Sequence, residues 1–152
     1  MRRNAWLAIL YGGLIAGTID VFAPVLIYWI NPIGVLRFIA GGLIGRPAAK
    51  AMGLQAAALG LVLQWLMSLI IAAIFVYAAT RIPALRRRWV AAGIAYGVVV
   101  FFVMNYVVRP LSMHRDFPQM DLYGFSTNMA AMWLFGLIIA WFAQRGLRSG
   151  TA

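Results

Sequence analysis

The sequence predicts an all-α integral membrane protein, a single domain over residues 1–152 in which four transmembrane helices form a bundle. Hydrophobic residues make up 64% of the chain and charged residues only 11%, proportions that a soluble globular core does not accommodate. The charged residues gather in short clusters between long apolar stretches, which is the pattern of membrane spans and their connecting loops.

Four apolar stretches are long enough to cross a bilayer core about 30 Å thick, which takes roughly 20 helical residues. The predicted spans cover residues 5–30, 53–79, 89–108 and 127–143. The first span follows Arg2 and Arg3 and so imitates a secretory signal peptide. Because it continues to Ile30 without a convincing small-x-small cleavage site, we expect a retained helix.

The segment between the first and second spans is apolar but too short to cross a membrane. It covers residues 31–47 and is followed closely by Lys50. We expect a short interfacial helix, in which Arg37, Arg46 and Lys50 extend toward the headgroups, or a re-entrant segment.

Basic residues are divided unevenly between the two sets of loops. Eight lie at the N-terminus, in the loop between the second and third spans and at the C-terminus, and five lie on the other side. This bias predicts that both termini are cytoplasmic. Although the net charge is +10, the cations flank apolar runs, so we expect the lipid bilayer and not nucleic acid as the partner.

Residues that carry common cofactors are scarce. The chain has no cysteine, which excludes disulfides and thiolate metal sites, and its single histidine excludes a bis-histidine haem within one subunit. No phosphate-binding loop or zinc-protease motif is present. We therefore expect no cofactor, resident metal or catalytic residue, and enzymatic activity stays open without being favoured.

The loop before the fourth span contains His114, Asp116 and Asp121, a combination that could bind a divalent cation. Arg115 lies between two of these candidate ligands and the spacing matches no known metal motif. A solvated loop is the favoured interpretation.

Small residues recur at positions that suit close packing of helices in lipid. The first span has Gly13 and Gly17, and the third has Gly93 and Gly97 at the same spacing. Each pair precedes a tyrosine and a proline, so the two spans could belong to two parallel repeats, although such features are common in membrane helices.

Asp20 is the most informative residue, because a carboxylate inside a span costs about 2.5 to 3.5 kcal/mol and normally faces protein or water. Gln64, on the antiparallel second span, falls at a similar depth and could form a hydrogen bond with it. Further polar residues lie toward the outer side. The candidate intramembrane polar site comprises Asp20, Gln64, Asn105 and Asn128, with Arg37 and Arg109 near its mouth.

Two interpretations of this site stay open. In the functional one, Asp20 exchanges a proton or cation, since burial and a nearby arginine tune the proton affinity of a carboxylate. In the structural one, Asp20 is a polar pin between helices.

Two stretches, from Gly12 to Asp20 and from Val103 to Ser112, resemble the YagU-like small bacterial inner-membrane proteins, over roughly the first three spans. This resemblance implies a helical bundle in the bacterial cytoplasmic membrane, with no assigned activity. Relatives often have histidine where this chain has Gln64, so the resemblance implies no metal or haem site here.

The leading hypothesis is a non-enzymatic membrane component, either an accessory subunit of a larger complex or a self-associating homo-oligomer, because of the glycine faces and the lack of catalytic motifs. The alternative is a small proton- or cation-coupled transporter or channel that uses Asp20, which resembles the general plan of small multidrug transporters without a motif match. A third hypothesis is an interfacial lipid-modifying enzyme that uses His114 and Asp116.

Overall fold

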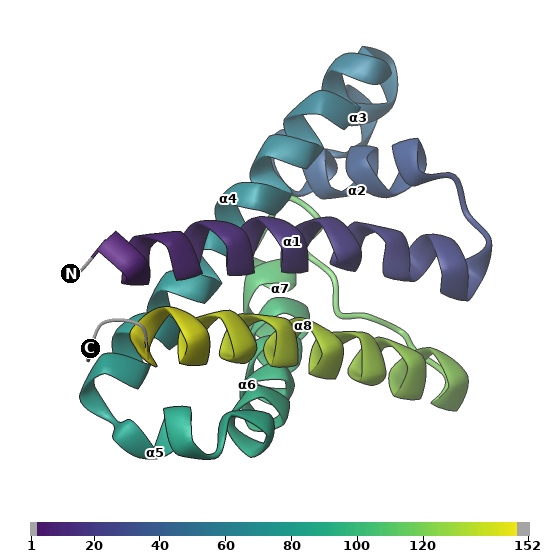
Figure 1. Ribbon diagram of the computed structural model, residues 1–152. Coiled ribbons are helices and arrows are strands. Elements are labelled where there is room, and N and C mark those ends of the chain that lie inside the picture. Colours follow the sequence, from purple (N-terminus) through teal and green to yellow (C-terminus); the bar gives the residue numbers. More distant parts are fainter. Residues whose placement is uncertain (1–2, 149–152) are drawn as a thin grey trace.

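The computed structural model describes residues 3–148, and within that range the regular structure is entirely helical. Arg2, which contributed to the charge count, lies outside the described residues. Four helical segments are long and apolar enough to cross a membrane (Figure 1). They are α1 (Arg3–Tyr28), α4 (Leu54–Arg81), the continuous segment Trp89–Leu111, and α8 (Leu122–Arg148). The predictions of an all-α chain and of four candidate spans are thus confirmed, and they indicate a membrane-embedded protein.

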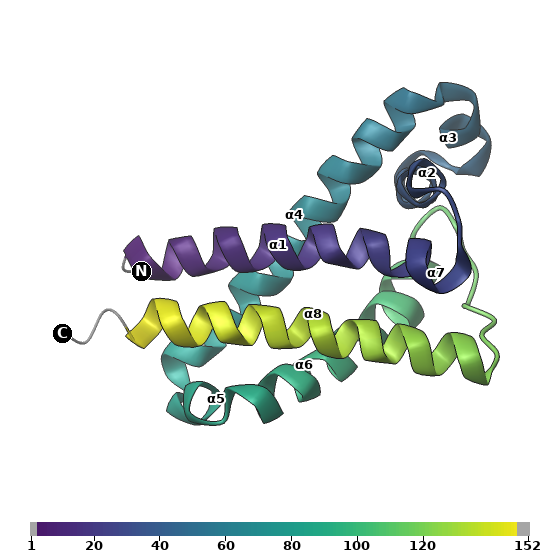
Figure 2. The same cartoon turned by 45° about the vertical axis from the view of Figure 1, so that its right-hand side comes forward.

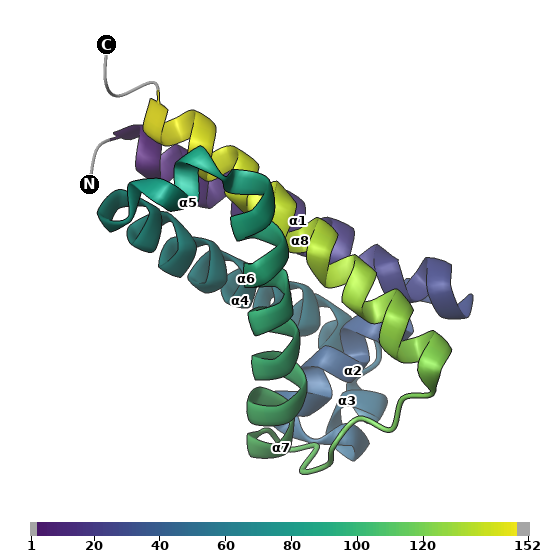
Figure 3. The same cartoon turned by 90° about the horizontal axis from the view of Figure 1, so that it is seen from below.

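The two ends of the described chain lie on the same side of the molecule. Figure 3 shows the start of α1 and the end of α8 near the short helix α5 (Pro83–Arg87). A Cβ atom on Gly146 would lie only 2.7 Å from the carbonyl oxygen of Asn4, so this glycine lets the two helix ends touch. Four consecutive helical segments run back and forth along the molecule, and this even number brings the two ends to the same side.

The two glycine pairs are packed inside the chain, each against the span that follows it. A Cβ atom on Gly17 would collide with the Ser68 hydroxyl of α4. One on Gly97 would collide with the backbone carbonyl of Met132 in α8, and one on Gly93 would lie 3.0 Å from the carbonyl oxygen of Gly136. Close helix approach explains these glycines.

The helices α4 and α6 diverge from α1 and α8 with increasing distance from the chain ends (Figure 3). Near the chain ends an apolar core closes the space between them, with large side chains from α4 and α8 such as Phe75, Val76, Phe135 and Ile139. The opposite half of the molecule, where the helices diverge, contains Asp20, Gln64, Asn105 and Asn128.

The third span has an irregular end. It consists of α6 (Trp89–Val103), a wide π turn η1 (Met104–Val108) and the short α7 (Arg109–Leu111). Pro110 has no N–H to donate to Tyr106, and its ring crowds that carbonyl. The wide turn just before it relieves this crowding, with the Arg109 N–H donating to the carbonyl of Met104.

The segment between the first two spans forms two helices, α2 (Pro32–Ile44) and α3 (Arg46–Met52). The side chain of Asn31 caps α2 by accepting a 2.8 Å hydrogen bond from the backbone N–H of Ile33. Gly45, with φ of 88°, separates α2 from α3. Figure 2 shows α2 end-on, beside α4 and the chain that follows α7. A side chain at Gly60 of α4 would collide with the Leu36 carbonyl, so α2 packs tightly against the second span.

The fourth span is longer than its apolar window, because α8 begins at Leu122 instead of residue 127 and ends at Arg148 instead of residue 143. Asp121 caps its start by accepting a 2.8 Å hydrogen bond from the Gly124 N–H. Ser126 and Thr127 donate their hydroxyls to carbonyls of the same helix, so these polar side chains do not interrupt it.

Candidate functional site

Asp20 and Gln64 form a hydrogen bond between the first two spans. The Gln64 Nε2 donates to the Asp20 Oδ2 over 2.9 Å, and it also lies 3.3 Å from the carbonyl oxygen of Gly17. Both side chains are partly buried. The contact depends on Gly17, since α4 approaches α1 where this residue has no side chain.

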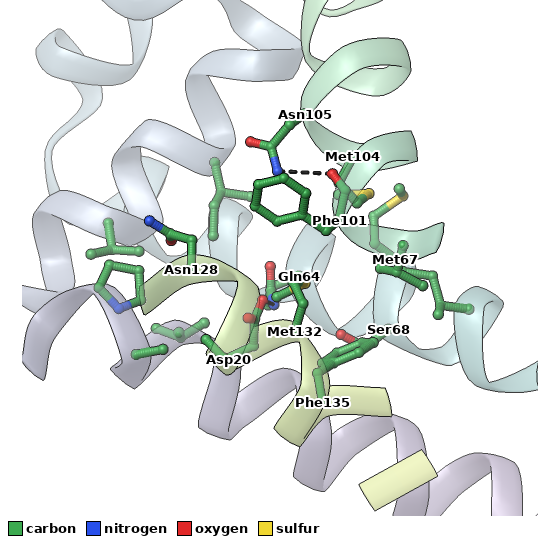
Figure 4. Close-up of a pocket in the computed structure, with 18 of the residues that line it drawn as sticks. Asp20, Gln64, Met67, Ser68, Phe101, Met104, Asn105, Asn128, Met132 and Phe135 are labelled. Carbon is green, nitrogen blue, oxygen red and sulfur yellow. Dashed lines mark hydrogen bonds between the residues drawn. The ribbon is translucent and has the colours of Figure 1, made fainter. Parts of the chain in front are cut away.

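The two residues lie on the wall of a cavity of about 250 Å³ between α1, α2, α4, the third span and α8. Figure 4 shows Asp20 and Gln64 facing each other, with Asn105 and Asn128 on separate helices around them. The polar residues that line the cavity are Asp20, Gln64, Ser68, Asn105 and Asn128. Most of the remaining lining is apolar and includes Phe101, Phe135 and the methionines Met67, Met104 and Met132.

The two asparagines have their amide nitrogens occupied by local partners. Asn105 Nδ2 donates to the Phe101 carbonyl over 2.9 Å. Asn128 Nδ2 donates to the Tyr28 hydroxyl over 2.8 Å and to the Gly124 carbonyl over 2.6 Å. Within residues 3–148 neither amide oxygen accepts a hydrogen bond. The cavity lining therefore includes a carboxylate, which can bind a proton or a cation, and two amide groups whose oxygens can ligate a cation.

Asp20 has no cationic partner among the described residues. Arg37 lines a separate surface pocket, and Arg109 forms an ion pair with Asp116. The structure therefore brings together four of the six residues of the predicted polar site, and it places Arg37 and Arg109 away from the cavity lining. Arg109 is held instead by Asp116, in the loop that follows the third span.

A cluster of five residues is centred on Phe38, next to the cavity at the α2 end. This cluster, called the Phe38 cluster, comprises Phe38, Arg46, Arg109, His114 and Asp116. Phe38 itself lines the cavity. The His114 ring stacks on the Phe38 ring with centroids 4.2 Å apart, and the guanidinium carbons of Arg109 and Arg46 lie 5.5 and 5.8 Å from the same ring.

Asp116 joins the two arginines of the Phe38 cluster. Its Oδ2 lies 2.7 Å from Arg46 Nη2, and its Oδ1 lies 2.9 Å from Arg109 Nε. The hydrogen bond from Arg109, followed by the charge of that arginine and the contact with Arg46, lowers the pKa of Asp116 to about 2. Asp116 is therefore ionised at every physiological pH.

His114 is held in its neutral form with a defined tautomer. Arg46 Nε donates to His114 Nδ1 over 3.1 Å, so the ring proton must lie on Nε2, which is 3.0 Å from the Phe38 carbonyl oxygen. Burial, together with the positive charges of Arg46 and Arg109, lowers the pKa of His114. The loop expected to be solvated thus packs against α2 because its side chains find partners there.

The divalent-cation interpretation of this loop gains no geometric support. Asp121 caps α8 and His114 accepts a hydrogen bond from an arginine. In the part of the chain that the structure describes, no three histidine or carboxylate side chains are grouped in a way that could hold a metal.

Phe38 and the three methionines of the cavity wall were not predicted as site residues. Nothing in the spacing of α2 marks Phe38, because its role depends on a loop more than 70 residues away. Ser68 is 1% exposed and lies against Gly17, so it is buried at the contact between α4 and α1.

No protein-family model, curated protein or solved structure matches the chain. The resemblance to YagU-like proteins therefore stays an expectation from the sequence.

Proposed function

We propose that this protein is a small membrane transport protein that moves a proton or a small cation, with Asp20 as the coupling carboxylate. The proposal rests mainly on one observation. Asp20 lies on the wall of a cavity, is oriented by Gln64, and has no cationic partner within residues 3–148.

An intramembrane carboxylate without a counter-ion has two ways to lower its free energy, because an isolated charge is costly there. It takes up a proton, or it binds a cation that enters the cavity. A carboxylate that can bind either species couples the transport of protons to the transport of the cation. A purely structural pin, by contrast, needs no cavity beside it.

The size and lining of the cavity favour a small ligand. Its volume of about 250 Å³ is below the range of roughly 300 to 1,000 Å³ that is usual for drug-sized ligands. The unoccupied amide oxygens of Asn105 and Asn128 add acceptors for a cation. The rest of the cavity wall is mostly apolar and carries no second negative charge. Asp20 can therefore neutralise one positive charge at a time.

Side chains restrict access to Asp20 from two directions in this conformation. The apolar core that includes Phe75 and Val76 closes the side of the chain ends, and Phe38 covers the other side. Phe38 belongs to a short helix and is held by side-chain contacts, so its displacement requires no rearrangement of a span. Transport would alternate between opening at Phe38 and opening at the core.

As membrane context we propose the bacterial cytoplasmic membrane, with both termini cytoplasmic and α2 and α3 lying at the outer interface. The Lys and Arg bias of the loops supports this orientation. It places the Phe38 cluster on the outer side and the apolar core on the cytoplasmic side.

Self-association or a role as an accessory subunit stays a prediction. The glycine pairs that motivated it pack against α4 and α8 of the same chain, so they supply no surface for another copy. An enzymatic role for His114 and Asp116 also stays untested, and both side chains are engaged in the Phe38 cluster.

The proposal is tested with the purified protein in liposomes that enclose a pH-sensitive dye. A gradient of sodium, potassium or tetramethylammonium is imposed, and the internal pH is followed. We expect at least one cation to drive a pH change with the wild-type protein, and Asp20→Asn to abolish it. Asp121→Asn is the matched control, because asparagine also caps a helix and Asp121 lies outside the cavity. Equal pH changes with Asp20→Asn and the wild type would contradict the proposal.

A further inference from the structure

A second pocket, separate from the Asp20 cavity, lies on the surface between α2 and α3. It has a volume of about 210 Å³. Its lining consists of Gly34, Arg37, Phe38, Arg46, Ala49 and Lys50. Three of these six residues are cations and none is acidic.

Helix geometry brings the three cations together. Arg46 and Lys50 are four residues apart on α3, which places them on one face, and Arg37 faces them from α2. Like charges at this spacing repel each other. Of the three, only Arg46 has an acidic partner, Asp116, at 2.7 Å, and it shares that partner with Arg109.

Arg37 and Lys50 are left without a partner. Neither side chain makes a hydrogen bond or an ion pair with any residue in the range 3–148. Arg37 is only partly exposed, so its guanidinium is not simply solvated like that of a surface arginine. Two uncompensated positive charges therefore line one pocket.

The floor of the pocket is open. A Cβ atom on Gly34 would meet nothing within 4 Å, so a ligand can approach the backbone of α2 between the cations. Ile33 and Leu43 are exposed apolar side chains elsewhere on α2, outside the pocket lining. A ligand that combines an anionic group with apolar chains matches both features.

We propose that this pocket binds the phosphate group of an anionic phospholipid. The segment that contains it joins two spans, which is where lipid headgroups lie, and basic pockets at this level are suited to anionic headgroups. Arg37 and Lys50 bind the phosphate oxygens by charge-assisted hydrogen bonds, and the acyl chains lie along the neighbouring spans. This site does not depend on transport through the Asp20 cavity.

The test uses the full chain in a mild detergent and measures lipid retention by native mass spectrometry. The probes are phosphatidylglycerol, phosphatidylcholine and inorganic phosphate. We expect the wild type to retain phosphatidylglycerol in preference to the other two. The double variant Arg37→Gln/Lys50→Gln is expected to lose affinity by roughly 30-fold, as removal of two cations near a headgroup predicts.

The charge-matched control is Arg87→Gln/Arg88→Gln, which removes two exposed cations from the loop between α4 and α6. It should keep the preference for phosphatidylglycerol. The variant Arg37→Lys/Lys50→Arg keeps both charges and should also bind, which separates loss of charge from misfolding. Equal losses in the two glutamine variants would overturn the proposal, and so would equal retention of phosphatidylcholine or of inorganic phosphate by the wild type.

Discussion

The Nε2 atom of His114 lies 3.0 Å from the carbonyl oxygen of Phe38, while the two rings stack with centroids 4.2 Å apart. This pair connects the loop after the third span to α2, and α2 covers the cavity that contains Asp20. The backbone adds a second link, since the Met113 N–H donates to the Gly42 carbonyl over 2.8 Å. The position of Phe38 beside the candidate site therefore depends on His114, which lies in a loop.

Protonation of His114 should weaken this link. His114 Nδ1 accepts a hydrogen bond from Arg46, and a protonated ring cannot accept it. Because the pKa of His114 lies below its ordinary value of 6.5, the contribution of the neutral ring to stability is complete above pH 6.5 and is lost as the pH falls through the lowered pKa. Asp116, with a pKa of about 2, stays ionised throughout.

We therefore expect the thermal stability of the wild type to fall more than that of His114→Gln as the pH is lowered from 8 to 5. Glutamine keeps a donor for the Phe38 carbonyl but does not titrate. Thermal unfolding in detergent measures the difference between the two proteins, which cancels the titration of all other groups. Parallel pH profiles would show that folding does not lower the pKa of His114, which would contradict this prediction.

Loss of the Asp116 charge should open the cavity. Asp116 holds Arg46 and Arg109 beside the Phe38 ring, and Asp116→Asn weakens both ion pairs. The chain has no cysteine, so a single cysteine reports access cleanly. A cysteine at Ala131, in the cavity lining, should react faster with a polar maleimide when Asp116→Asn is also present.

The control for this labelling is a cysteine at Ala48, which is exposed on α3 and should react at the same rate with and without Asp116→Asn. A rate at Ala131 that does not respond to Asp116→Asn would mean that the Phe38 cluster does not limit access.

The contact between α6 and α8 should be intolerant of added volume. A Cβ atom on Gly97 would collide with the Met132 carbonyl, which belongs to the backbone and cannot rotate away. We expect Gly97→Leu to destabilise the fold by about 1 to 3 kcal/mol or more, as overpacking does. Gly34→Ala is the control, since its Cβ meets nothing within 4 Å and alanine favours a helix. Thermal unfolding should rank the two variants in this order, and equal stability would contradict the packing.

The spans and the pairing of Asp20 with Gln64 were accessible from the sequence for a simple reason. Membrane thickness fixes the depth of a residue once the span is known, so two polar residues at equal depth on consecutive antiparallel spans are brought close. The same reasoning placed Asn105 and Asn128 toward the outer side, and both line the cavity.

Depth alone does not predict lateral position or loop contacts. Arg109 was expected at the mouth of the polar site, but Asp116, seven residues further along the chain, forms an ion pair with it. The role of Phe38 and the divergence of α4 and α6 depend on how α2 packs, and no periodicity in the sequence determines that packing. The length of α8 was underestimated because hydropathy does not register the Asp121 cap.

The protonation state of Asp20 distinguishes a coupling carboxylate from a structural pin. Infrared difference spectroscopy of the protein in lipid, with Asp20→Asn as the subtraction control, isolates the bands of this one carboxyl group. A coupling role for Asp20 predicts that the carboxylic-acid band gives way to carboxylate bands within the working pH range, and that the cation which drives transport shifts this titration. A carboxyl group that keeps one protonation state across that range, with and without the cation, would contradict it and leave Asp20 as a structural pin between α1 and α4.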